Sequence, residues 1–334
     1  MTWTFGTAAS SLGAEGAAPA ADWSGWERVG RAPASGDGNG FATNAASDFA
    51  LLASHGIAAH RITVEWARLE PTRGQWRAEE EQRYRTMLQA GRDAGVAVWV
   101  CLHHLSLPGW FSEDERGFLD ERMARRVWPA HVDRVASALG DLVAGWIPID
   151  QPATYAAAAF RDGAVPPGRS NEDDYATGLA ALRRANRDAA RLLRTGAAPV
   201  ACAHAPGEPP EELKLDAEVF DRIGLSVPAD AGSGVATALR RLVDQLGDES
   251  VPLAITSCGA GTTDEDERAE KATAVVGQVD DAVRDGLAVR ELFWWTAIDG
   301  YEPATGFTVP WGLFDRDRNP RPALPAVLEA IGGA

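Results

Sequence analysis

Short runs of apolar and β-branched residues alternate along this chain with longer segments in which apolar residues recur about every 3.6 positions. The short runs predict buried strands, and the longer segments predict helices with one apolar face. Eight strands are expected, at Thr2–Ala8, Ala58–Trp66, Val96–His104, Gly145–Gln151, Pro199–His204, Arg222–Val227, Pro252–Cys258 and Glu291–Asp299. Helices are expected at Asn44–His55, Glu79–Ala94, Ala124–Val143, Asp173–Arg194, Val235–Leu246, Glu265–Arg284 and Leu324–Ile331.

This regular alternation of strand and helix is typical of a parallel sheet. Eight strands with intervening helices favour a closed (β/α)8 TIM barrel over an open, doubly wound sheet. The length of 334 residues suits one barrel, so a single domain over residues 1–334 is expected. Gly30–Gly40 and Pro206–Glu212 read as loops, and Thr262–Glu267 reads as a loop that leads into a helix.

Charge and cysteine content narrow the functional classes. The net charge of -16 disfavours nucleic acids and anionic membranes as partners, because both repel an acidic surface. Cys101, Cys202 and Cys258 are widely spaced and form no CxxC pair, which disfavours a disulfide framework and structural zinc. No signal peptide or apolar membrane span is recognisable, so a cytoplasmic location is expected. No nucleotide-binding glycine motif follows a strand, and neither a cofactor nor a metal is expected. The pattern does not predict an oligomeric state.

Functional side chains of a barrel lie at the carboxyl ends of its strands. Read in order, these ends carry FGTAASSLGAEGA, HRITVEWARLEP, CLHHLSLPGW, WIPIDQP, LAITSCGAG and FWWTAIDGYEPATGF. The series resembles the motifs of family 1 glycosidases, which have FGTATSSYQIEGA, YRFSISWPRIEP, TLYHWDLPQW, WITFNEP, LYITENGAA and FVWSLLDNFEWAEGY in the same order. The resemblance spans nearly the whole chain and implies a glycoside or another small molecule as the ligand.

The resemblance also implies where the catalytic residues should lie. In the family, the Glu of NEP is the general acid/base and the Glu of TENG is the nucleophile of a retaining hydrolysis. The matching residues here are Gln151 and Ser257. An amide cannot exchange a catalytic proton at neutral pH, and a serine without a partner base is a weak nucleophile. Ordinary retaining β-glycosidase activity is therefore not expected.

Other residues match the sugar-binding positions of the family. By resemblance, Arg61 corresponds to the arginine that steadies the nucleophile, His104 and Glu302 to residues that bond sugar hydroxyls, and Trp295 to the indole under the sugar ring. Asp150 stands where the family has the Asn of NEP.

Glu65 departs from the family pattern and admits two interpretations. It shares strand parity with Arg61, so it is expected to point inward near the barrel mouth as a substitute carboxylate that works with Asp150. Alternatively, it forms a surface salt bridge with Arg68 or begins a loop.

Three functions remain open. The first is non-hydrolytic acid–base chemistry, such as a cyclisation, elimination or rearrangement of a sugar-like or specialised metabolite. In that hypothesis Asp150 or Glu65 transfers the proton, Gln151 and His104 donate hydrogen bonds, and Arg61, Ser257, Trp295 and Glu302 hold the substrate. The second is a non-catalytic carbohydrate-binding pseudoglycosidase, and the third is a β-glycosidase with displaced carboxylates.

Overall fold

A computed structural model describes residues 3–228 and 234–332. Thr2, the first residue of the first predicted strand, and the two ends of the predicted domain lie outside this range. Seven parallel strands form one sheet in the order β4-β3-β2-β1-β7-β6-β5. They are β1 Thr4–Ala8, β2 Ala59–Thr63, β3 Ala97–Cys101, β4 Gly145–Ile147, β5 Ile223–Ser226, β6 Leu253–Cys258 and β7 Val289–Trp295.

The predicted strand at Pro199–His204 is the piece that joins the two edges of this sheet. It makes isolated parallel bridges rather than a continuous ladder, from Val200 to Trp146 in β4 and from His204 to Leu225 in β5. Further along the same segment, the backbone N–H of Gln151 donates to the carbonyl of Ala203 at 2.9 Å. The sheet is thereby closed into a ring, which confirms the predicted (β/α)8 barrel.

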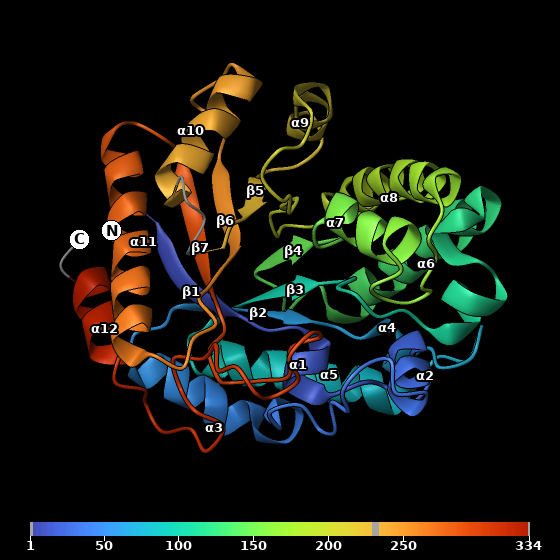
Figure 1. Cartoon of the computed structure of the whole chain (residues 1–334), viewed down its shortest axis with the longest axis horizontal. Coiled ribbons are helices and arrows are strands. Elements are labelled where there is room, and N and C mark those ends of the chain that lie inside the picture. Colours follow the sequence, from blue (N-terminus) through green and yellow to red (C-terminus); the bar gives the residue numbers. More distant parts are fainter. Residues whose placement is uncertain (1–2, 229–233, 333–334) are drawn as a thin grey trace.

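Helices surround the ring on all sides in Figure 1. All seven predicted helices are present, with ends that differ by a few residues: α3 Phe41–Ser54, α5 Ala78–Asp93, α6 Glu121–Leu139, α8 Glu172–Leu193, α10 Gly234–Leu246, α11 Glu265–Arg284 and α12 Leu324–Gly332. The pattern missed short helical segments in the loops, namely α1 Ser11–Glu15, α2 Asp22–Arg28, α4 Trp66–Leu69, η1 Trp110–Asp114, η2 Gly117–Leu119, α7 Pro152–Ala156, η3 Ala157–Arg161 and α9 Pro210–Ala217. None of the described helices is long and apolar enough to cross a membrane.

Two of the predicted loops can be compared with these elements. The Pro206–Glu212 prediction is wrong at its end, because α9 begins at Pro210, a residue whose fixed φ suits the first turn of a helix. The Thr262–Glu267 prediction is confirmed, because α11 begins at Glu265. The Asp264 side chain caps that helix by accepting hydrogen bonds from the backbone N–H groups of Asp266 and Glu267.

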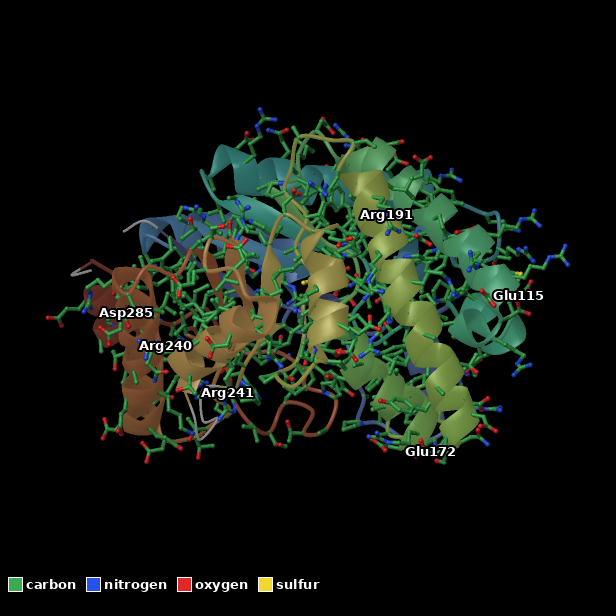
Figure 2. The ribbon with its side chains drawn as sticks, turned by 90° about the horizontal axis from the view of Figure 1, so that it is seen from above. Glu115, Glu172, Arg191, Arg240, Arg241 and Asp285 are labelled. Atoms are coloured by element: carbon green, nitrogen blue, oxygen red, sulfur yellow. The ribbon has the colours of Figure 1, made fainter. Side chains whose placement is uncertain are left out.

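Charged side chains cover the outer faces of the helices (Figure 2). In α8, acidic Glu172 stands at the amino end and basic Arg191 in the last turn, each where the helix dipole favours its charge. Between neighbouring helices, Arg240 of α10 pairs with Asp285, the residue that follows α11.

Small and aromatic side chains fill the inside of the ring. Trp99 and Phe293 meet edge to face with ring centroids 5.5 Å apart, and alanines from several strands pack around them. Because side chains alternate along a strand, residues two positions beyond these point inward as well. Arg61 in β2 and Trp295 at the end of β7 therefore face the barrel interior and its carboxyl end, where a functional site of this fold lies.

The wall of the barrel at Gly224 of β5 leaves no room for a side chain. A Cβ atom there would overlap the carbonyl oxygen of Cys202 and lie 2.6 Å from Cγ2 of Thr256. We expect Gly224→Ala to lower the free energy of unfolding by about 1–3 kcal/mol, as overpacking of a core does. Urea denaturation gives the measurement.

Gly277→Ala is the matched control for this substitution. Gly277 is exposed in α11, and its Cβ would meet nothing within 4 Å. The control should gain about 0.5–1 kcal/mol from helix propensity alone. Equal stability of the two variants would contradict the tight packing described for the wall.

Candidate functional site

A cavity of about 260 Å³ opens at the carboxyl ends of the strands. Every barrel segment except the one from β2 and the one at 199–204 supplies residues to its lining. The lining residues are Ser10, His104, Leu105, Asp150, Gln151, Ser226, Val227, Pro228, Ser257, Gly259, Trp295, Glu302, Pro303 and Trp311.

A buried ion pair lies at the base of this cavity. Nη2 of Arg61 donates to Oδ1 of Asp150 at 2.6 Å, and Nη1 donates to the carbonyl of Thr256 at 2.8 Å. Burial alone raises the pKa of the Asp150 carboxyl, but the Arg61 charge and the nearby His104 oppose it and bring the pKa below its usual range. Asp150 is therefore ionised at neutral pH and is a poor proton donor there.

His104 touches the same carboxylate from the other side. Its Nε2 lies 3.6 Å from Oδ2 of Asp150, and its ring is 5.5 Å from that of Trp295. Burial lowers the pKa of His104 to about 4, more than the neighbouring carboxylate raises it. The imidazole is thus neutral near pH 7, and its contact with Asp150 is not an ion pair. The preceding His103 faces away from the cavity and packs against Tyr155, 4.6 Å away between ring centroids.

Glu302 is the second carboxyl group that lines the cavity. Its Oε1 accepts a hydrogen bond of 2.7 Å from the indole Nε1 of Trp295. Two backbone hydrogen bonds with Gly306 fix the turn that carries it. Burial raises the pKa of Glu302 to about 7, although the bond from Trp295 acts against this. Glu302 can therefore gain or lose a proton near neutral pH, unlike Asp150.

Two lining residues have a strained backbone. Gln151, which stands directly before α7, has φ 44° and ψ 64°, while Leu105 has φ 72°. A left-handed conformation costs a non-glycine residue on the order of 1 kcal/mol or more, and such positions concentrate at functional sites. The Gln151 amide Nε2 lies 3.3 Å from Oδ2 of Asp150, so this conformation turns the amide toward the carboxylate.

The cavity also includes polar groups that the sequence motifs did not single out. Oγ of Ser226 and Nε1 of Trp311 are buried and have no hydrogen-bond partner among the described residues. Buried polar groups without a partner are uncommon in folded proteins, so these two make the cavity a candidate binding site. Ser226 pairs with Ser257 across the ends of β5 and β6. The signal that could have found Ser226 is its place in the carboxyl end of a strand.

Glu65 is not among the residues that line the cavity. The predicted strand Ala58–Trp66 ends early, at Thr63, so strand parity does not direct the Glu65 side chain. Instead Glu65 caps α4, and its Oε2 accepts hydrogen bonds of 2.6 Å from the hydroxyls of Ser11 and Ser106. The alternative of an exposed salt bridge is not seen either, since Glu65 is 2% exposed. Its predicted catalytic role stays a prediction.

The structure thus brings seven of the eight predicted site residues together. Asp150, Gln151, His104, Ser257, Trp295 and Glu302 line the cavity, and Arg61 supports it from below through Asp150. Among the described residues, one group of side chains lies close enough to hold a metal ion, and it is outside this cavity, at Cys202, His204 and Asp216.

The buried pair generates a prediction about stability. Replacing Arg61 by Met leaves Asp150 buried without its counter-charge, which should cost about 3–5 kcal/mol in the free energy of unfolding. Arg125→Met is the control, because the Arg125–Glu121 pair on α6 is more than half exposed and should contribute less than about 1 kcal/mol. Chemical denaturation of both variants would compare the two losses, and equal losses would show that Arg61 is not needed as a counter-charge.

The raised pKa of Glu302 generates a prediction about pH. Between the ordinary pKa of 4.5 and about 7, the folded protein keeps a proton that the unfolded chain has lost, so stability falls as the pH rises through this window. Gln at this position cannot ionise. Glu302→Gln should therefore raise the melting temperature relative to the wild type by about a few °C near pH 8 and by much less near pH 5.

Thermal melts across this range, with Glu121→Gln on the exposed face of α6 as control, provide the measurement. A difference between Glu302→Gln and the wild type that stays the same at both pH values would mean that Glu302 ionises like an exposed carboxyl.

Comparison with known proteins agrees with the geometry of the fold. The chain is 29% identical over 123 residues to Beta-glucosidase 11 of Arabidopsis thaliana, a match covering 36% of this chain and 23% of that protein. It is 27% identical over 187 residues to Beta-glucosidase 5 of Oryza sativa subsp. japonica, covering 51% of this chain and 35% of that protein. The chain thus spans only about a quarter to a third of the length of these curated relatives.

Solved structures share the whole fold at low sequence identity. A beta-glycosidase from Pyrococcus horikoshii superposes with a TM-score of 0.87 at 23% identity, covering 98% of this chain and 94% of that one. A beta-glucosidase from Thermotoga maritima in complex with deoxynojirimycin gives a TM-score of 0.88 at 16% identity, with coverages of 99% and 97%. The sequence model of glycosyl hydrolase family 1 matches residues 2–201, more than half of the chain. This chain therefore belongs to glycosyl hydrolase family 1.

Proposed function

We propose that the cavity carries out acid–base chemistry other than glycoside hydrolysis on a sugar-like or specialised metabolite, with Glu302 as the group that transfers the proton. The observation that carries the proposal is the contrast between the two carboxyls of the cavity. Asp150 is fixed as an anion by Arg61, whereas Glu302 titrates near neutral pH. Two carboxyls whose environments push their pKa values apart are a usual arrangement for separate acid–base and electrostatic roles.

The sequence predicts that Glu302 holds the substrate, and we propose that it also transfers the proton. It lines the cavity, and the indole N–H of Trp295 fixes the position of its Oε1 at 2.7 Å. A general acid or base works best when its pKa is near the working pH and its side chain is held in place. Asp150 meets the second condition but not the first, because its pKa is lowered.

The residues at the two catalytic positions implied by the family resemblance support a non-hydrolytic reaction. Retaining hydrolysis needs one carboxyl to protonate the leaving oxygen and another to attack the anomeric carbon. Gln151 offers an amide, and Ser257 offers a hydroxyl that makes no hydrogen bond to a base among the described residues. Both side chains can bond a substrate hydroxyl, but neither replaces a reacting acid.

The lining suits a ligand about the size of one sugar ring. Two indoles, Trp295 and Trp311, provide apolar faces, and Ser10, Ser226 and Ser257 provide hydroxyls at the same opening. Aromatic faces combined with a few convergent polar groups are typical of small-molecule sites. A volume of about 260 Å³ leaves little room for a longer oligosaccharide.

Two other functions fit some of these observations. A carbohydrate-binding pseudoglycosidase would also use Trp295, Glu302 and the free polar groups of the lining. A glycosidase with displaced carboxylates would need Asp150 and Glu302, both of which line the cavity, to act as its reacting pair.

Aryl β-glycosides such as 4-nitrophenyl β-glucoside separate hydrolysis from the other functions. We expect no release of nitrophenol by the wild type, and slow release by the double variant Gln151→Glu/Ser257→Glu, because the variant restores the two carboxyls. Hydrolysis by the wild type that Asp150→Asn or Glu302→Gln abolishes would overturn the proposal in favour of displaced carboxylates.

A metabolite extract then separates catalysis from binding. The wild type should consume a small polar compound, seen by mass spectrometry, and Glu302→Gln should slow this turnover by about 10²–10⁴-fold. Stabilisation by deoxynojirimycin in a thermal melt, lost in Trp295→Ala, checks that the cavity of each variant is intact. Stabilisation by such ligands without turnover of any compound would instead establish a binding protein.

A further inference from the structure

A second cluster of chemically active side chains lies on the outer face of the barrel wall and does not line the cavity. Ala201 and Ala203 pack inside the ring, so Cys202 and His204 point to its outer face, toward the helices. There they meet Asp216 of α9. One ligand atom from each of the three residues lies within 4.8 Å of the others, and none of the three side chains is more than 4% exposed.

The contacts around these three residues hold them in position. Nε2 of His204 lies 2.8 Å from Oδ2 of Asp216, while the other oxygen, Oδ1, accepts a 2.6 Å hydrogen bond from Nε of Arg187. The backbone N–H of Gly224 points at Sγ of Cys202 at 3.4 Å. Hydrogen bonds to a ligating sulfur and to the outer oxygen of a carboxylate are the contacts that support metal ligands.

Protein hydrogen bonds do not account for all polar atoms of the cluster. Nδ1 of His204 is buried without a partner among the described residues. A hydrogen-bonded structural core would be expected to satisfy such an atom. The cluster therefore has spare binding capacity in its buried interior.

The charges around the cluster can be balanced by a metal ion as well as by protons. Three acidic side chains, Glu208, Glu212 and Asp216, face Arg183, Arg187 and the imidazole of His204 in a connected network of ion pairs. A divalent cation bound to a neutral His204 and a Cys202 thiolate would replace one proton on each of these two side chains, so the total charge of the network would be kept.

We propose that Cys202, His204 and Asp216 form a binding site for a thiolate-seeking divalent metal, with Zn²⁺ as the ion that fits best. A sulfur, an imidazole nitrogen and a carboxylate oxygen are the donor types that zinc takes, and three protein ligands leave the fourth tetrahedral position to water. The cysteine spacing leads us to expect no structural zinc and no metal, because the ligands of this site are separated by one and eleven residues rather than arranged as CxxC.

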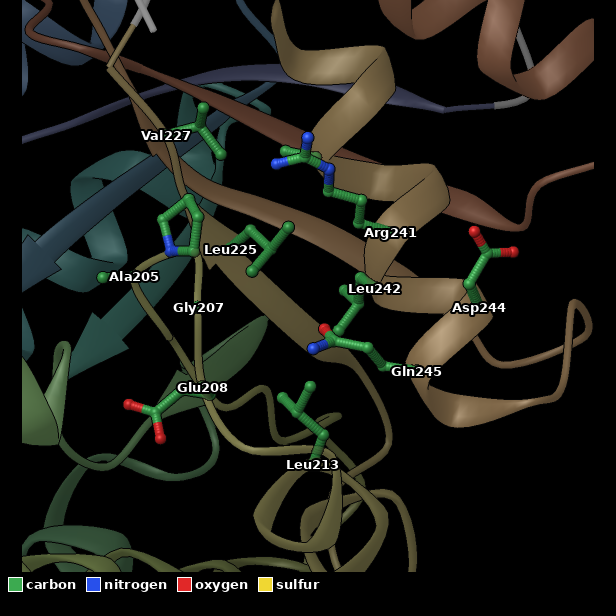
Figure 3. A pocket seen from close by; sticks show the side chains of 12 residues that line it. Ala205, Gly207, Glu208, Leu213, Leu225, Val227, Arg241, Leu242, Asp244 and Gln245 are labelled. Carbon is green, nitrogen blue, oxygen red and sulfur yellow. The ribbon is translucent and has the colours of Figure 1, made fainter. Parts of the chain in front are cut away.

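A metal ion at this site would help to attach α9 to the barrel. Leu213 is the buried apolar residue of this eight-residue helix, and the exposed Leu215 contributes little packing. On one side, α9 borders a second cavity of about 420 Å³ that separates it from Leu225, Leu242 and other residues of β5 and α10 (Figure 3). A metal that bridges Asp216 to Cys202 and His204 would attach α9 to the barrel wall where apolar packing is thin.

Cobalt(II) is a suitable probe, since it occupies zinc sites and shows intense absorption when a thiolate binds it. We expect the purified full chain, after treatment with a chelator, to bind one Co²⁺ with a thiolate-to-cobalt charge-transfer band. Zn²⁺ should displace the cobalt, abolish the band and raise the melting temperature. Cys202→Ser should lose the band, and Cys258→Ser, which alters another buried thiol, should keep it.

Asp216→Asn serves if Cys202→Ser does not fold, as judged by circular dichroism. It keeps the shape of the side chain and the thiolate, so the band should persist while the affinity for Co²⁺ falls about 10-fold or more. A folded wild type without the band would overturn the proposal, as would a band that survives in folded Cys202→Ser or an affinity that Asp216→Asn leaves unchanged. None of these outcomes depends on the reaction proposed for the cavity.

Discussion

The contact between Arg61 and Asp150 sets the character of the whole barrel mouth. The guanidinium reaches from β2 to a carboxylate that follows β4 and to the carbonyl of Thr256 in β6, so one side chain links three parts of the ring. Buried ion pairs add little net stability, because both charges lose their water, but they tolerate no other arrangement of their partners. This pair fixes Asp150 as an anion, and the remaining carboxyl of the cavity, Glu302, is then the one free to exchange a proton near neutral pH.

Backbone strain around this pair also indicates that the shape of the cavity mouth is fixed. Gln151 keeps a left-handed conformation beside Asp150, and Leu105 does the same next to His104. A residue holds such a conformation only where its surroundings over-determine it. At Gln151 the surroundings are the hydrogen bond to Ala203, the proline that begins α7 and the contact with Asp150. The mouth therefore retains a defined shape even though Gln151 itself cannot act as an acid, which argues for a site that still binds a ligand.

The barrel and most of the cavity could be predicted from the sequence, because they depend on strand ends and on motifs that survive in order. Seven of the eight strands and all seven long helices follow from apolar spacing alone. The segment at 199–204 makes single bridges because its neighbours are the short β4 and an irregular β5. The apolar spacing within one segment carries no information about irregularities in the strands beside it. Glu65 was misplaced for a related reason. Parity holds only while a strand continues, and β2 stops at Thr63, two residues too early.

The sequence could not show contacts between side chains that come together only when the chain folds. The titration of Glu302 depends on burial and on the indole of Trp295, seven residues away on the far side of a turn. Ser226 becomes a cavity residue only because β5 and β6 end side by side. Cys202 and His204 gain a third partner only because α9 folds back over the barrel wall.

The segment at 199–204 connects the two sites that the chain carries. Its inward residues include Ala203, whose carbonyl holds the backbone of Gln151 at the cavity, and its outward residues Cys202 and His204 face α9. This segment is bound to its neighbours by isolated bridges rather than by a continuous ladder. An ion that ties its outer face to Asp216 would restrain the same backbone that positions Gln151 and, through it, the amide beside Asp150. Occupancy of the outer site and order at the cavity mouth would then be linked by one short stretch of chain rather than by any direct contact between them.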